Sequence, residues 1–170
     1  MLPAKTMKKS ISMFDDLIHQ VNKGIKTQTI RLIKSNTVNT IDFKTQFETC
    51  NHSKNDYKDY PALQLVLTKF SRYFKGDILS IENSKTVIEI LTVRLDKVFN
   101  ITDEALEKEG IKSQPNLTAP NVLVYYDYLS ENFSLNTIRE SYKTLMVKCY
   151  GSDVLQDQPY VFVYTFKVIE

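Results

Sequence analysis

The feature that most constrains the fold is a helix-to-strand corner near the N-terminus. Before the corner, apolar residues follow the i, i+3, i+4, i+7 spacing of one buried helical face, at Phe14, Leu17, Ile18 and Val21. Gly24 comes next, where a left-handed residue often ends a helix. Residues 25–33 are rich in Thr and Ile, which favour a half-buried strand. We therefore expect a helix that turns directly into a strand.

The corner also gathers polar side chains, from Lys26 to Arg31. In a regular strand beginning at Ile25, Lys26 and Thr29 would point to opposite faces, because side chains alternate. For these two residues to act together, Lys26 must belong to the turn and the strand must begin after it.

The other predicted elements follow from periodicity and from helix start and stop signals. The first is a helix that begins at Pro61 and is ended by Gly76-Asp77, and a hairpin of strands 78–82 and 86–95 follows it. A short helix is expected between Thr102 and Gly110, and two more near 121–131 and 135–149, the last of them capped by Ser134. A final strand begins at Tyr160. Glu109 falls in the last turn of the short helix, where the dipole disfavours a carboxylate unless a positive group faces it.

Composition limits the class of protein. The 170 residues suit one domain, and a net charge of +2 does not by itself indicate a nucleic-acid binder. Two cysteines indicate reduced thiols and a cytoplasmic location, and no apolar run approaches the roughly 20 residues of a membrane span. Cys50 and His52 offer only two ligands, so we expect no metal site and no cofactor.

Four segments carry a family resemblance. Gly24, Lys26, Thr29 and Arg31 match the pattern G-x-K-x-x-T-x-R, and residues 75–79, 102–111 and 160–166 match three further pieces in the same order. In these segments the chain resembles the ASCH domain of the PUA-like group. The resemblance implies an α+β fold, a mixed β-barrel with flanking helices, as one domain over residues 1–170.

The chain is longer than many ASCH domains, and the extra length lies in two segments. We expect helical insertions at about 34–75 and 111–158. They are expected to cover the barrel edges, to form a homodimer or to bind a protein partner, and periodicity does not choose among these roles.

The resemblance also implies a site. In ASCH amidohydrolases that deacetylate 4-acetylcytidine, the motif Lys, the motif Thr and the helix Glu are catalytic, which here are Lys26, Thr29 and Glu109. A Thr hydroxyl needs a base to become a nucleophile, and a buried lysine with a lowered pKa can serve as one. Gly24, Thr27 and Arg31 are the expected ligand-binding residues.

Three functions remain open from the sequence. The first is a module that binds RNA, a nucleotide or a modified nucleoside at the corner, and the second is the amidohydrolase. The third is a scaffold that acts through its insertions. Each motif also has a plainer explanation: Lys26 and Glu109 can be only an ion pair, and Tyr125, Tyr126 and Tyr128 can be core residues rather than base-stacking platforms.

Overall fold

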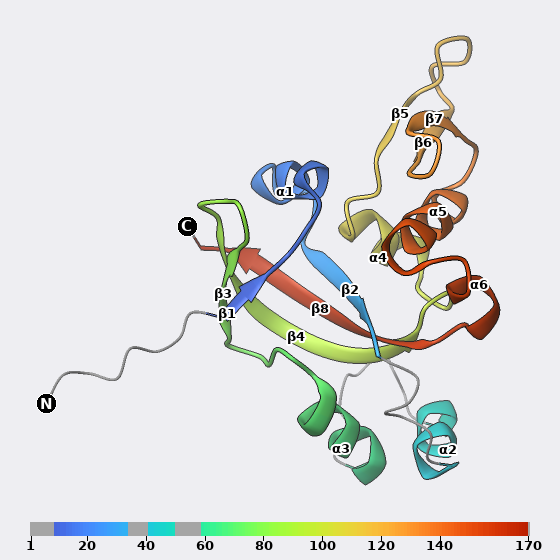
Figure 1. Ribbon diagram of the computed structural model, residues 1–170. Helices are drawn as coiled ribbons and strands as arrows, with labels where there is room; N and C mark the ends of the chain where they lie inside the picture. The colour runs from blue at the N-terminus through green and yellow to red at the C-terminus, as the bar shows by residue number, and fades with distance from the viewer. Residues whose placement is uncertain (1–8, 34–40, 50–58, 170) are drawn as a thin grey trace, which may run out of the picture.

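The computed structural model describes residues 9–33, 41–49 and 59–169. Its centre is a five-stranded mixed sheet with the order β1-β3-β4-β8-β2 (Figure 1). The strands are β1 (Lys9–Ile11), β2 (Gln28–Leu32), β3 (Ile78–Ile81), β4 (Val87–Lys97) and β8 (Tyr160–Val168). β1 and β3 are parallel, and the other neighbours are antiparallel. The predicted hairpin and final strand are confirmed.

The expected β-barrel is wrong, although the α+β class is right. Among the described residues β1 and β2 are the two edges of an open sheet, and no closed barrel is formed. In the described ranges β1 covers three residues, and β3 is the one strand there that pairs with it. The sheet buries its apolar side chains against helices on both faces, so closure is not needed to protect them.

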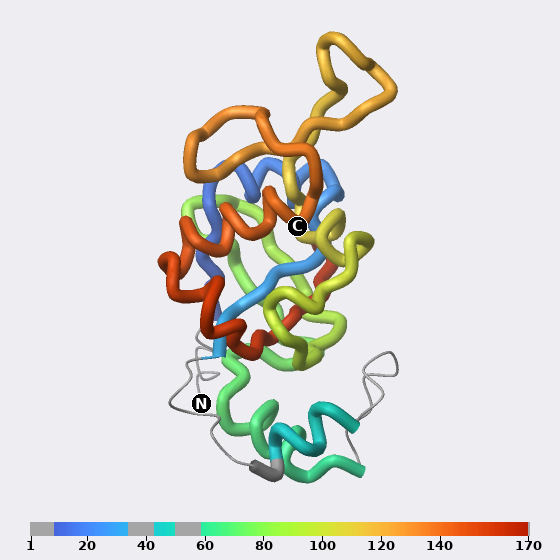
Figure 2. Tube along the Cα trace, turned by 90° about the vertical axis from the view of Figure 1, so that its right-hand side faces the viewer, coloured from blue at the N-terminus to red at the C-terminus, as the bar shows by residue number. Residues whose placement is uncertain are grey.

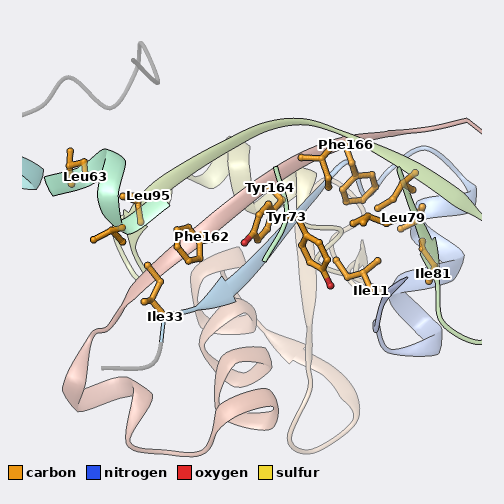
Figure 3. Packing of buried hydrophobic residues seen from close by; sticks show 14 of the residues in the cluster. Ile11, Ile33, Leu63, Tyr73, Leu79, Ile81, Leu95, Phe162, Tyr164 and Phe166 are labelled. Atoms are coloured by element: carbon orange, nitrogen blue, oxygen red, sulfur yellow. The ribbon is translucent and has the colours of Figure 1, made fainter. Parts of the chain in front are cut away.

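Two cores lie on opposite faces of the sheet, as the alternation along β8 shows. Phe162, Tyr164 and Phe166 belong to the first core, together with residues of α2 (Ile41–Thr49) and α3 (Pro61–Phe70) (Figure 3). Val161 and Val163 belong to the second core, which lies under α4 (Asp103–Lys108) and α5 (Ile138–Tyr150). Side chains alternate between faces along a strand, so β8 supplies both cores.

The first insertion contains α2 and α3 in its described part, and its residues 34–40 and 50–58, which include Cys50 and His52, lie outside the described residues. Pro61 occupies the first turn of α3, as predicted. The helix ends at Phe70 rather than at Gly76-Asp77, and Phe74 is exposed.

The second insertion differs most from the prediction. Residues 121–131 do not form a helix; they belong to a three-stranded sheet of β5 (Ser113–Pro115), β6 (Leu123–Asp127) and β7 (Asn132–Leu135). The Asp127 carboxylate accepts the backbone N–H groups of Leu129 and Ser130, which fixes the turn after β6. Figures 1 and 2 show this sheet extending away from the central one, at the opposite end from α2 and α3.

Tyr125, Tyr126 and Tyr128 pack on the second core, and Tyr128 is buried. The packing therefore favours a core role for these tyrosines over a role as base-stacking platforms. α5 follows the sheet, and α6 (Val154–Asp157) completes the insertion.

α5 begins with a capping box at Thr137, not at Ser134. The Thr137 hydroxyl accepts the Glu140 N–H, and the Glu140 carboxylate accepts the Thr137 N–H at 3.0 Å. We expect Thr137→Ala to lower the free energy of unfolding by about 1 kcal/mol in urea denaturation. Thr137→Ser, which keeps the hydroxyl, should cost much less; equal losses in the two variants would show that the cap is not what stabilises α5.

Candidate functional site

The helix-to-strand corner is formed as the sequence predicts. α1 (Asp15–Asn22) buries Leu17, Ile18 and Val21, and Gly24 follows it with φ +72°. Phe14 precedes the helix and is exposed. β2 begins at Gln28, so Lys26 lies in the turn before the strand. The backbone N–H groups of Ile25 and Lys26 both donate to the Gln20 carbonyl, which holds the turn against α1.

The last turn of α4 is bound to this corner by three hydrogen bonds. Lys26 Nζ donates to the Glu109 carbonyl at 2.7 Å, Thr27 N to the Lys108 carbonyl at 2.9 Å, and Gln28 Nε2 to the Ala105 carbonyl at 3.1 Å. The Lys108 and Glu109 carbonyls lie at the end of a helix, where backbone acceptors lack intrahelical partners, whereas the Ala105 carbonyl also accepts the Glu109 N–H at 3.1 Å. Residues 26–28 therefore complete the C-terminus of α4, which Thr102 caps at its other end.

Lys26 and Glu109 also form a buried ion pair. Lys26 Nζ lies 2.8 Å from Glu109 Oε1, and the two residues are 1% and 4% exposed. The ammonium supplies the positive group that a carboxylate at the C-terminus of a helix requires. From the sequence, a carboxylate in the last turn of this helix was unexpected, and the contact with Lys26 explains it.

Burial moves the two pKa values toward each other. It lowers the pKa of the Lys26 ammonium below 10.5 and raises the pKa of the Glu109 carboxyl above 4.5, while each charge partly offsets the shift of the other. The difference in proton affinity between the two groups is thereby reduced, so a proton can pass between them at a smaller cost than in water.

Gly110 lets the helix end approach the corner this closely. Its φ is +81°, and a Cβ built on it would lie 2.9 Å from Lys26 Cβ and 3.3 Å from Gln20 Cβ. Only a residue without a side chain fits both the left-handed backbone and this contact.

A cavity of about 390 Å³ lies beside β2, between α1 and α5; we call it the site cavity. Thr29, Arg31 and Glu109 line it, as do Leu17 of α1 and Leu145 and Met146 of α5. Thr29 and Arg31 share one face of β2 because they are two residues apart. Arg31 is held by its bonds to the Ser12 and Ile30 carbonyls.

Two of the residues that line the site cavity each carry a buried oxygen that lacks a hydrogen-bond partner in the described part of the chain. Thr29 Oγ1 and Glu109 Oε2 are buried and have no partner at full hydrogen-bond geometry among the described residues, while the Ile30 backbone N–H is close enough to the Glu109 carboxyl to lower its pKa. Buried polar atoms are nearly always paired, and leaving one unpaired costs about 1–3 kcal/mol. A hydroxyl and a carboxylate oxygen unsatisfied at the same cavity are a physical reason to consider it a binding site.

The structure thus separates the six residues that the sequence singles out. Lys26 contacts Glu109 but is not part of the cavity wall, so Glu109 stands between the lysine and the cavity. Gly24 and Thr27 do not line the cavity: Gly24 is exposed at the end of α1, and Thr27 makes backbone bonds to Lys108 and Phe166. Sequence reasoning missed Arg72 and Tyr150, which line the cavity and belong to no motif.

Two features are absent from the described part of the chain. It contains no cluster of three or more His, Cys, Asp and Glu side chains suited to a metal ion. None of the helices within it is both long and apolar enough to cross a membrane.

The fold and the site together define an α+β protein with a buried Lys–Glu pair beside a cavity. No family model matches the chain, and no curated protein matches it. One solved structure similar to it is the crystal structure of hypothetical protein PH0355, at 17% identity, with 96% of this chain and 100% of that chain covered and a TM-score of 0.45. A likeness this slight supports no argument about fold or function.

Proposed function

We propose that the site cavity recognises a nucleoside of the cytidine type, free or within a nucleotide or RNA, in a cytoplasmic protein related to the ASCH family. The observation that carries the proposal is the pair of unsatisfied oxygens, Thr29 Oγ1 and Glu109 Oε2. An acylated exocyclic amine presents an N–H donor beside a carbonyl acceptor. The carboxylate can accept the first and the Thr29 hydroxyl can donate to the second, so one amide would satisfy both oxygens.

The sharper form of the proposal is hydrolysis of that amide, for which the Thr29 hydroxyl turns its proton from the acyl oxygen toward the Glu109 carboxylate. Thr29 Oγ would attack the acetyl carbonyl, and the Lys26–Glu109 pair would accept the hydroxyl proton and return it to the exocyclic nitrogen as the amide bond breaks. Cytidine leaves, and water then hydrolyses the acetyl ester on Thr29 to acetate. Because Glu109 separates Lys26 from the cavity, we assign Lys26 to setting the proton affinity of Glu109.

The test is to incubate the protein with 4-acetylcytidine and to measure the cytidine released. We expect turnover in the wild type and a loss of at least about 100-fold in kcat for Thr29→Val, which removes the hydroxyl and keeps the shape. Thr68→Val, the same change on the exposed side of α3, is the matched control.

Turnover that survives both Thr29→Val and Glu109→Gln in folded protein would eliminate the catalytic assignment. If no cytidine is released but the nucleoside binds, and Thr29→Val weakens binding about tenfold, recognition without chemistry is the function. If the nucleoside does not bind at all, the proposal is wrong.

The alternative, an interaction module, has one observation in its favour. Apolar side chains are exposed on and around the β5–β7 sheet, namely Leu117, Val122, Leu123, Leu129 and Phe133. A second copy of the chain is the simplest partner for such a surface. Sedimentation of the wild type against Leu123→Lys would detect a dimer formed in this way.

A further inference from the structure

A second cavity of about 390 Å³ adjoins the site cavity. Its wall is aromatic, with Phe70, Tyr73, Phe162 and Tyr164 among its residues, and we call it the aromatic cavity. Ser12, Arg31 and Arg72 line both cavities. The two hollows therefore meet at a junction that carries two guanidinium groups.

The charge at this junction is unbalanced. In the described residues neither Arg31 nor Arg72 has a carboxylate partner within ion-pair distance. Glu109 is the only acidic residue in the described lining of the two cavities, and its Oε1 is paired with Lys26. Within the part of the chain that the structure describes, two positive charges thus meet at the junction, and Glu109 is the single carboxylate of the lining that partly offsets them.

The two arginines differ in how they are held. Arg31 donates to the Ser12 carbonyl at 2.5 Å and to the Ile30 carbonyl at 3.2 Å, which fixes its position without exhausting its five donors. Arg72 is exposed at the end of α3, with its guanidinium carbon 5.6 Å from the centre of the Tyr73 ring. Arg31 is therefore held in place by the protein, whereas Arg72 is exposed.

We propose that Arg31 and Arg72 bind a phosphate group, so that the preferred ligand of the site cavity is a phosphorylated nucleoside. Planar guanidinium groups bind phosphate oxygens through paired N–H bonds, and the apolar walls of the aromatic cavity strengthen the attraction by excluding water. A free nucleotide and a nucleotide within single-stranded RNA both present this group. The identity of the nucleoside rests on the function proposed above, whereas the phosphate site does not.

The first experiment tests the phosphate site alone. Inorganic phosphate is titrated at constant ionic strength, and the melting temperature is followed for the wild type, Arg72→Gln and Lys75→Gln. Lys75 is exposed, lies outside both cavity walls and loses the same charge. A ligand that binds only the folded state raises the melting temperature with concentration. We expect an apparent Kd about tenfold or more weaker in Arg72→Gln than in the other two proteins. Equal responses in all three would overturn the proposal.

The second experiment asks which molecule carries the phosphate. Calorimetry compares 4-acetylcytidine, its 5′-monophosphate and a short single-stranded RNA that contains the same base. The wild type should prefer the monophosphate or the RNA over the nucleoside by about tenfold or more, and Arg72→Gln should lose that preference. Tighter binding of RNA than of the monophosphate identifies RNA as the source, and the reverse identifies the free nucleotide.

The two proposals fail in different ways. If the nucleoside binds but phosphate adds no affinity, the phosphate site is wrong and the function stands. If inorganic phosphate binds through Arg72 while no nucleoside binds, the phosphate site stands and the function is wrong.

Discussion

Lys26→Met is expected to lower the free energy of unfolding by about 3–5 kcal/mol, the cost of breaking a buried ion pair from one side. The substitution leaves Glu109 buried without its partner at 2.8 Å, and it removes the donor of the Glu109 carbonyl at 2.7 Å. Methionine fills a similar volume, so the loss reports on charge and hydrogen bonding rather than on a cavity. Urea denaturation at neutral pH measures it.

The double variant Lys26→Met, Glu109→Leu is the control. Replacing both charges with apolar groups of similar size is often close to neutral, because no charge is then left buried. We therefore expect the double variant to be more stable than the sum of the two single losses implies, by at least 1 kcal/mol. Strictly additive losses would mean that the two groups do not interact.

The single variants should also respond to pH in opposite directions. In Lys26→Met, burial keeps the pKa of Glu109 above 4.5 in the folded state. The folded protein then holds a proton that the unfolded chain releases, so stability relative to wild type is greatest below pH 4.5 and falls as the pH rises.

In Glu109→Gln, Lys26 keeps a pKa below 10.5 in the folded state. The unfolded chain then binds the proton more tightly, so stability relative to wild type rises as the pH approaches 10.5. Slopes of the same sign in both variants would contradict the assignment of burial as the main cause of the two shifts.

Gly110→Ala is expected to lower the free energy of unfolding by about 2–5 kcal/mol. Left-handed backbone costs a residue with a Cβ about 1–2 kcal/mol, and forcing an extra methyl group into a packed contact costs about 1–3 kcal/mol more. Here the methyl group would meet Lys26 Cβ at 2.9 Å, and both atoms belong to tightly held segments. Thermal or urea denaturation gives the loss.

Gly76→Ala isolates the backbone part of this effect. Gly76 has φ +86°, and a Cβ on it would meet no atom of the described segments within 4 Å. Gly76→Ala should therefore lower the free energy of unfolding only by the cost of the left-handed backbone, about 1–2 kcal/mol. If the two alanine variants lose the same stability, the close approach of α4 to the corner does not contribute.

The corner could be predicted because its signals are local. The apolar stripe of α1, the glycine that ends it and the Thr-rich strand are read within twenty residues, and they predict the corner; that Lys26 belongs to the turn was a condition for its acting with Thr29, and the strand indeed begins only at Gln28. The contact with Glu109 was indicated by a mismatch with the dipole of α4, which required a cation nearby. Such a mismatch shows that a partner exists, and the resemblance to ASCH proteins supplied its identity.

The errors come from properties that no short window contains. Whether a sheet closes depends on how its first and last strands meet, and the parallel pairing of β1 with β3 leaves no trace in periodicity. Residues 121–131 contain apolar residues that fit a helix, but the turn at Asp127 and the packing of Tyr128 decide for a hairpin. Arg72 follows α3 without any motif, and only the fold brings it beside Arg31.

The Lys26–Glu109 contact joins residues that are 83 positions apart in the chain. The entropy cost of closing a loop of this length falls before the contact can stabilise anything. Other interactions therefore have to bring the two segments together first. We infer that the pair forms late on the folding route and stabilises the finished protein more than the route to it. Its main effect is then to lengthen the lifetime of the native state, because it slows unfolding and leaves the folding rate almost unchanged.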